Sequence, residues 1–262
     1  MKPKLLIIKI GGNVLDNPEA LETFLDDFAA FGTLKILVHG GGKIASTLAS
    51  KLGIAQQLVN GRRITDAETL DLVTMVYGGL INKNIVAKLQ ARKCNALGIC
   101  GADGNILPAV KRAVNEIDYG FVGDIDYSDL SASRIQLLLD TGLSMVIAPL
   151  THDKKGKLLN TNADTIASCL ARVLSFNYTS ELVYCFEKEG VLDASNMVIP
   201  IITPDSYKKL LSDKVVSDGM IPKIDNSFDA LNAGVSSVRI MQAASLSLLR
   251  KGKNPGTIIR KE

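Results

Sequence analysis

The sequence contains no tryptophan, which carries no functional information, and few of the residues that build metal sites. Its four cysteines form no CxxC pair, and its two histidines do not provide the spacing of a zinc site. We therefore expect no metal site. The plain interpretation of the cysteines is that they are buried, reduced thiols in a cytoplasmic protein.

Long apolar runs and basic patches are missing as well. No apolar stretch approaches the roughly 20 residues that cross a bilayer. The apolar N-terminal segment is broken by Lys9 and lacks a small-residue cleavage site, so it does not fit a signal peptide. The formal net charge is +3, and lysines and arginines are scattered instead of interleaved with aromatics. We expect neither a membrane partner nor a nucleic-acid partner.

The composition of the 262-residue chain is that of an ordinary globular protein, with 47% hydrophobic and 22% charged residues. Buried-strand patterns alternate with helical patterns along it. This alternation predicts an α/β fold in which helices cover both faces of a mainly parallel sheet. The length alone does not decide between one domain and two. A boundary between two lobes is expected near Ser175–Ser180, before a predicted strand at Glu181–Phe186.

Two glycine turns follow predicted buried strands. Gly40–Gly42 follow the apolar run Ile36–Val38 and precede a helical pattern, and Gly11–Gly12 follow Leu5–Ile10. Neither turn matches GxGxxG or the P-loop. Glycine lets the backbone approach a ligand closely, and a helix N-terminus attracts an anion. Gly40–Gly42 alone could equally be a tight turn.

Lys9 interrupts the first strand just before its glycine turn. Burying a lysine there is costly unless it has an anionic partner, and ligands of open α/β sheets bind at the carboxyl ends of the strands. We therefore predict a phosphate or carboxylate site beside Lys9. The alternative is an edge-strand lysine that faces solvent.

Further polar groups are weaker candidates when each is taken alone. Arg62 and Arg63 could clamp a carboxylate or phosphate, although such arginines are usually solvated. Asn160 and Asp164 lie in the segment NTNAD before and within a predicted helix, where an acid favours the helix dipole. Lys223 lies near a helix start, where its charge invites an anionic partner. It could equally be a surface lysine.

Local patterns between these groups predict the intervening structure. Thr65 and Glu68 have the spacing of a capping box, which predicts a helix start. Gly78 and Gly79 are expected to interrupt that helix. The alternation within residues 111–129 predicts a short antiparallel excursion.

In this order, the motifs LIIKIGG, LVHGGGK, NGRRIT, NTNAD and SDGMIPKI resemble those of the N-acetyl-L-glutamate kinases. The likeness covers nearly the whole chain and includes GGLINKNIV and YGFVGDI. The first two motifs alone would indicate only the amino-acid-kinase superfamily, which includes carbamate, aspartate, glutamate and uridylate kinases. NGRRIT and NTNAD indicate the acylglutamate branch.

The resemblance implies an αβα sandwich on a mainly parallel sheet, the carbamate-kinase-like fold, as one domain over residues 1–262. Its N-terminal lobe, 1–176, would bind the acylglutamate, and its C-terminal lobe, 177–262, would bind ATP. ATP with Mg²⁺ would phosphorylate the side-chain carboxylate of N-acetyl- or N-succinyl-L-glutamate in arginine biosynthesis. A cytoplasmic homodimer is implied. Because the first strand begins by Leu5, we expect no N-terminal hexamer-forming helix and no inhibition by arginine.

The resemblance also implies residue roles. Lys9 and Lys223 would neutralise charge on the transferring phosphoryl group, and Asp164 would hold both lysines. Backbone N–H groups would bind phosphate at Gly11, Gly12 and Gly41. The substrate would be bound by Gly41, Gly42, Arg63 and Asn160, the last two on its α-carboxylate. Nucleotide contacts would come from Glu187, Gly190, Val191, Leu192, Ser217, Asp218, Gly219 and Met220.

Two positions depart from the family's pattern. The family usually has TDVxGV where this chain has CFEKEGV, with Glu187 at the usual aspartate position, which leaves the adenine and ribose contacts open. An apolar residue usually precedes the substrate-binding arginine, and here that residue is Arg62. A guanidinium suits the terminal carboxylate of N-succinyl-L-glutamate better than an acetyl methyl. The alternative is that Arg62 faces solvent and acetylglutamate is used.

Two other functions fit the same fold. One is another carboxylate kinase of the superfamily, and the other is a non-catalytic regulator that binds a nucleotide or an amino acid. The joint presence of Lys9, Asp164 and Lys223 argues against a regulator. The small number of histidines is no objection to a kinase, since an ionised acceptor carboxylate needs positioning and charge stabilisation more than a strong base.

Overall fold

The structure is a computed structural model that describes residues 2–59, 61–216 and 220–262. The chain divides into two compact units, Met1–Ile36 with Ala167–Glu262, and Leu37–Ile166. The chain passes between the units within β2 (Leu34–His39) and within α7 (Ala163–Leu174). The first unit is therefore built from two segments that are far apart in the sequence.

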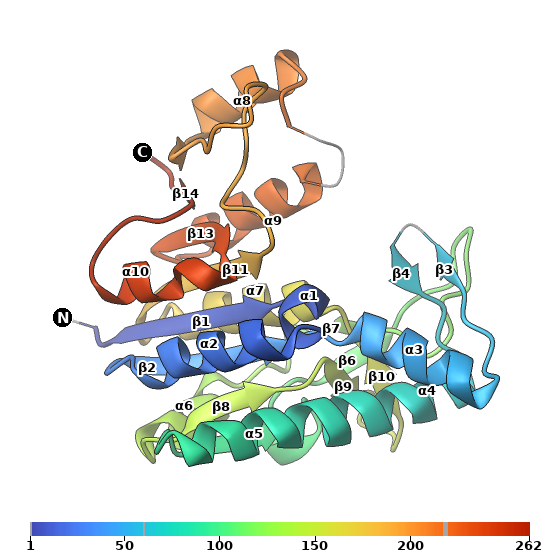
Figure 1. The fold of residues 1–262 in the computed structure, drawn as a ribbon. Helices are drawn as coiled ribbons and strands as arrows, with labels where there is room; N and C mark the ends of the chain where they lie inside the picture. The colour runs from blue at the N-terminus through green and yellow to red at the C-terminus, as the bar shows by residue number, and fades with distance from the viewer. Residues whose placement is uncertain (1, 60, 217–219) are drawn as a thin grey trace. The chain divides into compact units, whose positions relative to one another are not determined.

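The first unit is built on strands that run in the order β12, β14, β13, β11, β1 (Figure 1). Their bounds are β1 Lys4–Ile10, β11 Thr179–Phe186, β12 Ile201–Ile202, β13 Ser237–Gln242 and β14 Thr257–Ile259. β1, β11 and β13 are parallel, whereas β14 is antiparallel to β13. The predicted mainly parallel α/β arrangement is confirmed.

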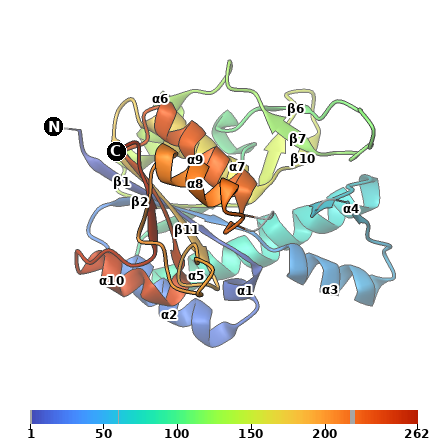
Figure 2. The same cartoon turned by 90° about the horizontal axis from the view of Figure 1, so that it is seen from above.

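Helices cover these strands on both faces. Their bounds are α1 Gly12–Leu15, α2 Pro18–Ala29, α8 Pro204–Ser212, α9 Ile221–Asn232, the 3₁₀ turn η3 Ala243–Ser245, and α10 Leu246–Arg250. Figure 2 shows α2 and α10 on one side of β1 and β11, and α9 on the other. The side chain of Asn17 caps α2 by accepting the N–H of Ala20 at 3.1 Å. Phe24, Leu25 and Phe28 of α2 are buried in the core.

The second unit combines parallel strands with three small antiparallel pairs. β5 (Ala96–Ile99) pairs with β8 (Ser144–Ile147) in parallel. The antiparallel pairs are β3 Leu58–Val59 with β4 Arg62–Arg63, β6 Ala109–Lys111 with β7 Gly123–Ile125, and β9 Leu150–His152 with β10 Leu158–Asn160. The predicted antiparallel excursion within 111–129 corresponds to β6 and β7. Residues of this excursion and Arg62 of β4 line a cavity that is described below.

The helices of the second unit pack mainly on β5, β8 and each other. Their bounds are α3 Gly42–Leu52, α4 Ala67–Val73, η1 Thr74–Ile81, α5 Asn82–Ala91, the 3₁₀ turn η2 Asp103–Asn105, and α6 Ala132–Asp140. α3 ends at Gly53, where φ is 72°. This left-handed conformation favours glycine and terminates the helix.

Two local predictions for this unit were wrong. Gly78 and Gly79 do not interrupt the helix, because residues Thr74–Ile81 form a π-helix that joins α4 to α5 directly. The N-cap of α4 is Asp66, whose side chain accepts the N–H of Thr69 at 2.8 Å. Thr65, expected in that position, is buried and donates its hydroxyl to a carbonyl instead.

The lobes predicted from the resemblance, 1–176 and 177–262, were defined by their ligands and stay a prediction. The compact units divide the chain differently, since β1 pairs with β11 and so places the N-terminal strand with the C-terminal segment. Among the described residues, we find no helix long and apolar enough to cross a membrane.

Candidate functional site

Gly41 lies at the N-terminus of α3, where the chain requires glycine. Its φ is 149°, a conformation that other residues rarely adopt, and a Cβ would overlap Ile81 and approach the ring of Tyr77 to 3.1 Å. The absence of a side chain therefore brings the start of α3 close to the π-helix. The first N–H groups of an α-helix have no partner within it, so this terminus can bind an anion.

Arg63 is buried against this helix terminus. One terminal nitrogen, Nη2, donates to the carbonyl oxygen of Gly42 and to Oγ of Ser46, both at 2.8 Å. The other, Nη1, donates to Oε1 of Gln56. The side chain is only 8% exposed, so Arg63 is not a solvated loop arginine, and its role in binding the substrate stays a prediction. Gln56 and Ser46 were not predicted.

Asn160 is connected to Arg63 through Thr65. The Asn160 side-chain amide donates to Oγ1 of Thr65 at 3.0 Å, and the same hydroxyl donates to the carbonyl oxygen of Arg63 at 3.2 Å. The structure thus brings Arg63, Gly42 and Asn160 into one hydrogen-bonded group. Thr65 was not predicted as a linking residue, because its spacing to Glu68 indicated a helix cap.

His39 closes β2 as a neutral imidazole. It is fully buried, and burial lowers the pKa of His39 to about 4. Its Nδ1–H donates to the carbonyl oxygen of Gly40 at 2.7 Å, and its Nε2 accepts from the Asn82 amide at 3.3 Å. Asn82 also donates to the carbonyl oxygen of Val146 at 3.0 Å. The imidazole therefore fixes the strand end that leads into the glycine turn.

Lys9 and Lys223 of the first unit share one aromatic ring. Nζ of Lys9 lies 5.5 Å from the ring centroid of Phe186, and Nζ of Lys223 lies 3.9 Å from it. Lys9 is only 8% exposed at the end of β1, so it does not face solvent, and its anion-binding role stays a prediction. Burial raises the pKa of Cys185 to about 12, although the charge of Lys9 acts in the opposite direction. Phe186 was not predicted, and its only indication was its place in the unusual stretch CFEKEGV.

The glycine turn after Lys9 lies at the start of α1. Gly11 has extended backbone at the N-cap, and Gly12 is the first residue of this four-residue helix. A Cβ at Gly11 would lie 3.8 Å from Nζ of Lys9. Gly11 therefore leaves the space beside the lysine open.

The predicted nucleotide contacts lie after β11 and before α9. Glu187 is exposed, whereas Gly190 and Val191 are buried. The N–H of Val191 donates to Oγ1 of Thr257 at 2.8 Å, and Leu192 forms a β-bridge with Val198. Met220 directly precedes α9. The predicted residues Ser217, Asp218 and Gly219 lie outside the described residues.

Asp164 lies in the first turn of α7. Its N–H donates to Oδ1 of Asn162 at 2.8 Å, and the same oxygen accepts the N–H of Thr165 at 3.2 Å. Asn162 thus caps the start of this helix. The predicted role of Asp164 toward the two lysines stays a prediction.

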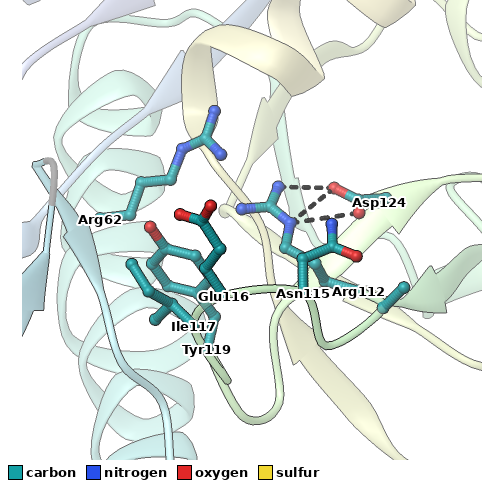
Figure 3. Close-up of a pocket in the computed structure, with 8 residues that line it drawn as sticks. Arg62, Arg112, Asn115, Glu116, Ile117, Tyr119 and Asp124 are labelled. Carbon is teal, nitrogen blue, oxygen red and sulfur yellow. Dashed lines mark hydrogen bonds and ion pairs between the residues drawn. The ribbon is translucent and has the colours of Figure 1, made fainter.

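Arg62 lies on β4 beside Arg63 but is exposed. Successive side chains of a strand point to opposite faces, so the side chains of Arg62 and Arg63 lie on opposite faces of β4. Arg62 lines a cavity of about 660 Å³ together with residues of the loop between β6 and β7 (Figure 3).

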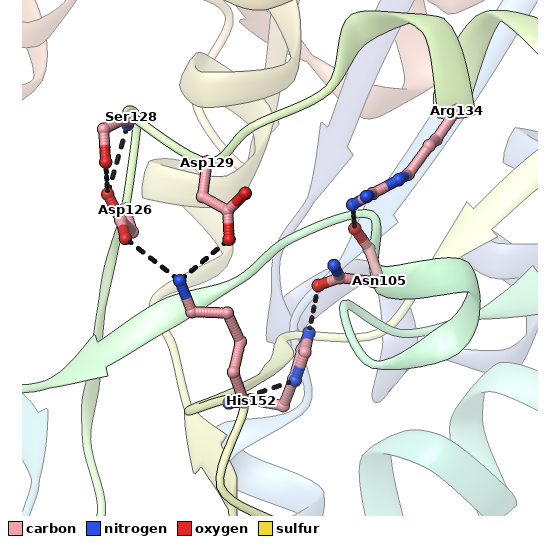
Figure 4. Close-up of polar contacts among 7 residues, drawn as sticks. Asn105, Asp126, Ser128, Asp129, Arg134 and His152 are labelled. Atoms are coloured by element: carbon pink, nitrogen blue, oxygen red, sulfur yellow. Dashed lines mark hydrogen bonds and ion pairs between the residues drawn. The ribbon is translucent and has the colours of Figure 1, made fainter.

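A second polar cluster of this unit has its charges paired among themselves (Figure 4). Nζ of Lys154 lies 2.8 Å from Asp129 and 3.5 Å from Asp126. Nε2 of His152 is hydrogen-bonded to Oδ1 of Asn105 at 2.8 Å. Such partly exposed ion pairs contribute little to stability, and these side chains hold loops together.

The model of the amino acid kinase family matches residues 4–242. An acetylglutamate kinase from Cytophaga hutchinsonii is 58% identical over 259 residues, which are 97% of each chain. Two solved structures share the fold. N-acetylglutamate synthase from Neisseria gonorrhoeae has a TM-score of 0.83 at 22% identity, and the match covers 99% of this chain and 60% of the synthase. Carbamate kinase from Giardia lamblia has a TM-score of 0.72 at 13% identity, over 100% and 99% of the two chains.

Proposed function

The chain belongs to the amino acid kinase family, and from this premise we propose that it transfers the γ-phosphoryl group of ATP to the side-chain carboxylate of an N-acyl-L-glutamate. The product is an acyl-phosphate. The observation that carries the proposal is the pair of ammonium groups, Lys9 and Lys223, gathered on the ring of Phe186. Two positive charges at one place suit a phosphoryl group whose negative charge must be stabilised during transfer.

The first unit carries the phosphate-binding part of this chemistry. Lys9 and Lys223 would neutralise the oxygens of the transferring group, and the N–H groups of Gly11 and Gly12 would donate to phosphate oxygens. ATP would enter as its Mg²⁺ complex. Glu187, Gly190, Val191, Leu192 and Met220 remain the proposed nucleotide contacts, with Ser217, Asp218 and Gly219 outside the described residues.

The second unit carries the carboxylate-binding part. Arg63 donates three hydrogen bonds to Gly42, Ser46 and Gln56, and a guanidinium has five N–H donors. A further side-chain hydrogen bond joins the guanidinium to the hydroxyl of Tyr77, so one donor and the positive charge remain for the α-carboxylate of the substrate. The Asn160 amide has a second N–H for the same carboxylate, and the N–H groups at Gly41 and Gly42 would complete the site. No base is required, because the acceptor carboxylate is ionised at neutral pH.

The remaining parts of the proposal rest on the family alone. Asp164 would hold the two lysines in position. The enzyme would act in arginine biosynthesis, as a homodimer in the cytoplasm. Light scattering of the purified protein tests the homodimer, and a monomer or a hexamer would contradict it.

An acceptor panel tests the reaction. ADP release is measured with N-acetyl-L-glutamate, N-succinyl-L-glutamate, L-glutamate, L-aspartate and carbamate at matched concentrations. We expect turnover with the two acylated compounds and little with the other three. Faster turnover with a free amino acid or carbamate would indicate another carboxylate kinase, and ATP binding without turnover of any acceptor would indicate a regulator.

The two lysines are tested by Lys9→Ala and Lys223→Ala. We expect kcat to fall by about 10²–10³ in each, because a preorganised charge contact to the transferring group is lost. Asp164→Asn should also lower kcat. Lys208→Ala removes a largely exposed lysine of the same unit and serves as the control. Folded lysine variants with near wild-type kcat would refute the assignment.

A further inference from the structure

The cavity beside Arg62 has no role in the reaction proposed above. It measures about 660 Å³, within the range of small-molecule sites, and lies in the unit Leu37–Ile166. The residues that matter for its chemistry are Arg62, Arg112, Glu116, Tyr119 and Asp124 (Figure 3). Two guanidinium groups therefore face one cavity.

Arg112 is held rigidly and has one donor left over. Its Nε lies 3.1 Å from both carboxylate oxygens of Asp124, and its Nη2 lies 2.5 Å from Oδ1. These hydrogen bonds raise the pKa of Arg112, so the group stays charged. Its Nη1 is buried and has no hydrogen-bond partner in the described part of the chain. Figure 3 shows this nitrogen pointing away from Asp124 into the cavity, where an acceptor would relieve the cost of leaving it unpaired.

Arg62 offers a second charged donor group. Its guanidinium is exposed and forms no hydrogen bond or ion pair with the described residues. Glu116, also exposed, extends its carboxylate into the space between the Arg62 and Arg112 side chains (Figure 3). A carboxylate of the protein itself thus occupies the place where an anionic ligand group would be attracted by both arginines.

The cavity borders the residues proposed to bind the acceptor. The N–H of Thr65 donates to the carbonyl oxygen of Tyr119 at 2.9 Å, and Thr65 is the residue that links Asn160 with Arg63. The N–H of Arg112 donates to the carbonyl oxygen of Val122 at 2.8 Å, and Val122 forms a β-bridge with Asn160. The walls of the cavity are therefore hydrogen-bonded to the segments that carry Asn160 and Arg63.

We propose that the cavity binds the terminal carboxylate of a dicarboxylic N-acyl group, which makes N-succinyl-L-glutamate a better substrate than N-acetyl-L-glutamate. This inference rests on the proposed kinase function. An acetyl group ends in a methyl, which leaves Nη1 of Arg112 unpaired and Arg62 without a partner. A succinyl group adds two carbons and a carboxylate, which accepts from both guanidiniums while Glu116 turns into solvent.

The test compares kcat/KM for three acceptors in the full-length enzyme. These are N-acetyl-L-glutamate, N-succinyl-L-glutamate and N-succinamoyl-L-glutamate. The succinamoyl group is as long as succinyl but ends in an uncharged amide. We expect succinyl to be preferred over both others in the wild type. In Arg62→Gln and in Arg112→Gln, the succinyl-to-acetyl ratio should fall about tenfold to a hundredfold, the size expected for a lost charge-assisted hydrogen bond.

Two further variants separate recognition from structural damage. Glu116→Gln removes a like charge, so it should lower KM for the succinyl compound, a gain that damage would not produce. Arg134→Gln is the matched control, since Arg134 donates to the carbonyl oxygen of Asn105 and does not line the cavity (Figure 4). It should leave the ratio unchanged. Arg112→Gln leaves Asp124 without its partner and could fail to fold. In that case the succinyl-to-acetyl ratio of Arg62→Gln alone decides the test.

The outcomes distinguish this inference from the proposed function. Preference for the acetyl compound, or a succinyl preference that neither arginine variant changes, overturns the inference and leaves the kinase function standing. If neither acylglutamate is phosphorylated, the proposed function fails. In that case, calorimetric titration of the wild type and Arg62→Gln with both compounds tests the inference by binding alone. Tighter binding of the succinyl compound that is lost in Arg62→Gln supports the inference, and equal binding of both compounds overturns it.

Discussion

The ring of Phe186 lies under two ammonium groups that would otherwise repel each other. Aromatic faces attract cations by about 0.5–2 kcal/mol, so the ring offsets part of this repulsion. We expect Phe186→Leu to lower kcat by about 2–30-fold through misplaced lysines, with KM for the acceptor little changed. Phe186→Tyr keeps the ring and should restore most of the rate. Equal kcat in Phe186→Leu and the wild type would show that the ring does not position the lysines.

Only some of the candidate site residues could be predicted from the sequence. Lys9 could be predicted because a lysine at the end of an apolar strand needs an anionic partner. Arg63 and Asn160 followed from the resemblance, and the structure shows both in one hydrogen-bonded group. Phe186 and Arg112 could not be predicted, because their importance depends on neighbours that are distant in the sequence.

At the scale of elements, β2 ends in a histidine that the fold keeps neutral. The pKa of His39 is about 4 in the folded state and 6.5 without burial, so the unfolded chain takes up a proton between these values and the folded chain does not. Stability is therefore complete above pH 6.5 and falls as the pH decreases toward 4. Between pH 7 and pH 5 the loss from this group is about 2 kcal/mol.

Urea unfolding of wild type and His39→Gln at pH 7 and pH 5 measures this effect. The substitution removes the titrating group, so the variant should lose less unfolding free energy on acidification than the wild type, by about 2 kcal/mol. For each protein, the change in unfolding free energy between pH 7 and pH 5 is compared, because the substitution also changes stability at every pH. An identical pH dependence in both proteins would show that His39 is protonated in the folded state as easily as in the unfolded one.

The elements themselves were predicted unequally. The strand, the glycine turn and the helix in residues 36–52 were predicted correctly, because an apolar run, three glycines and helical spacing follow one another there. The π-helix Thr74–Ile81 was not, since two adjacent glycines normally weaken a helix. Its side chains Tyr77 and Ile81 lie against Gly41 at the start of α3. That contact is tertiary and leaves no local pattern.

At the scale of the whole molecule, the α/β class was predictable and the division into units was not. The alternation of strands and helices is a local property of the sequence. The pairing of β1 with β11, which joins Lys4 to Thr179, is not, and it places the N-terminal strand with the C-terminal segment. Local sequence patterns do not reveal a unit that is assembled from two separate segments.

The proposed reaction forms an acyl-phosphate on the side chain of an N-acylglutamate. Phosphorus NMR of the enzyme with Mg²⁺·ATP and N-acetyl- or N-succinyl-L-glutamate follows the γ-phosphoryl group directly. We predict a new acyl-phosphate resonance that grows with ADP, disappears on adding hydroxylamine, and is absent in Lys9→Ala over the same period. Release of inorganic phosphate without an acyl-phosphate, or no acceptor-dependent loss of ATP, would show that the enzyme does not transfer the phosphoryl group to the acylglutamate.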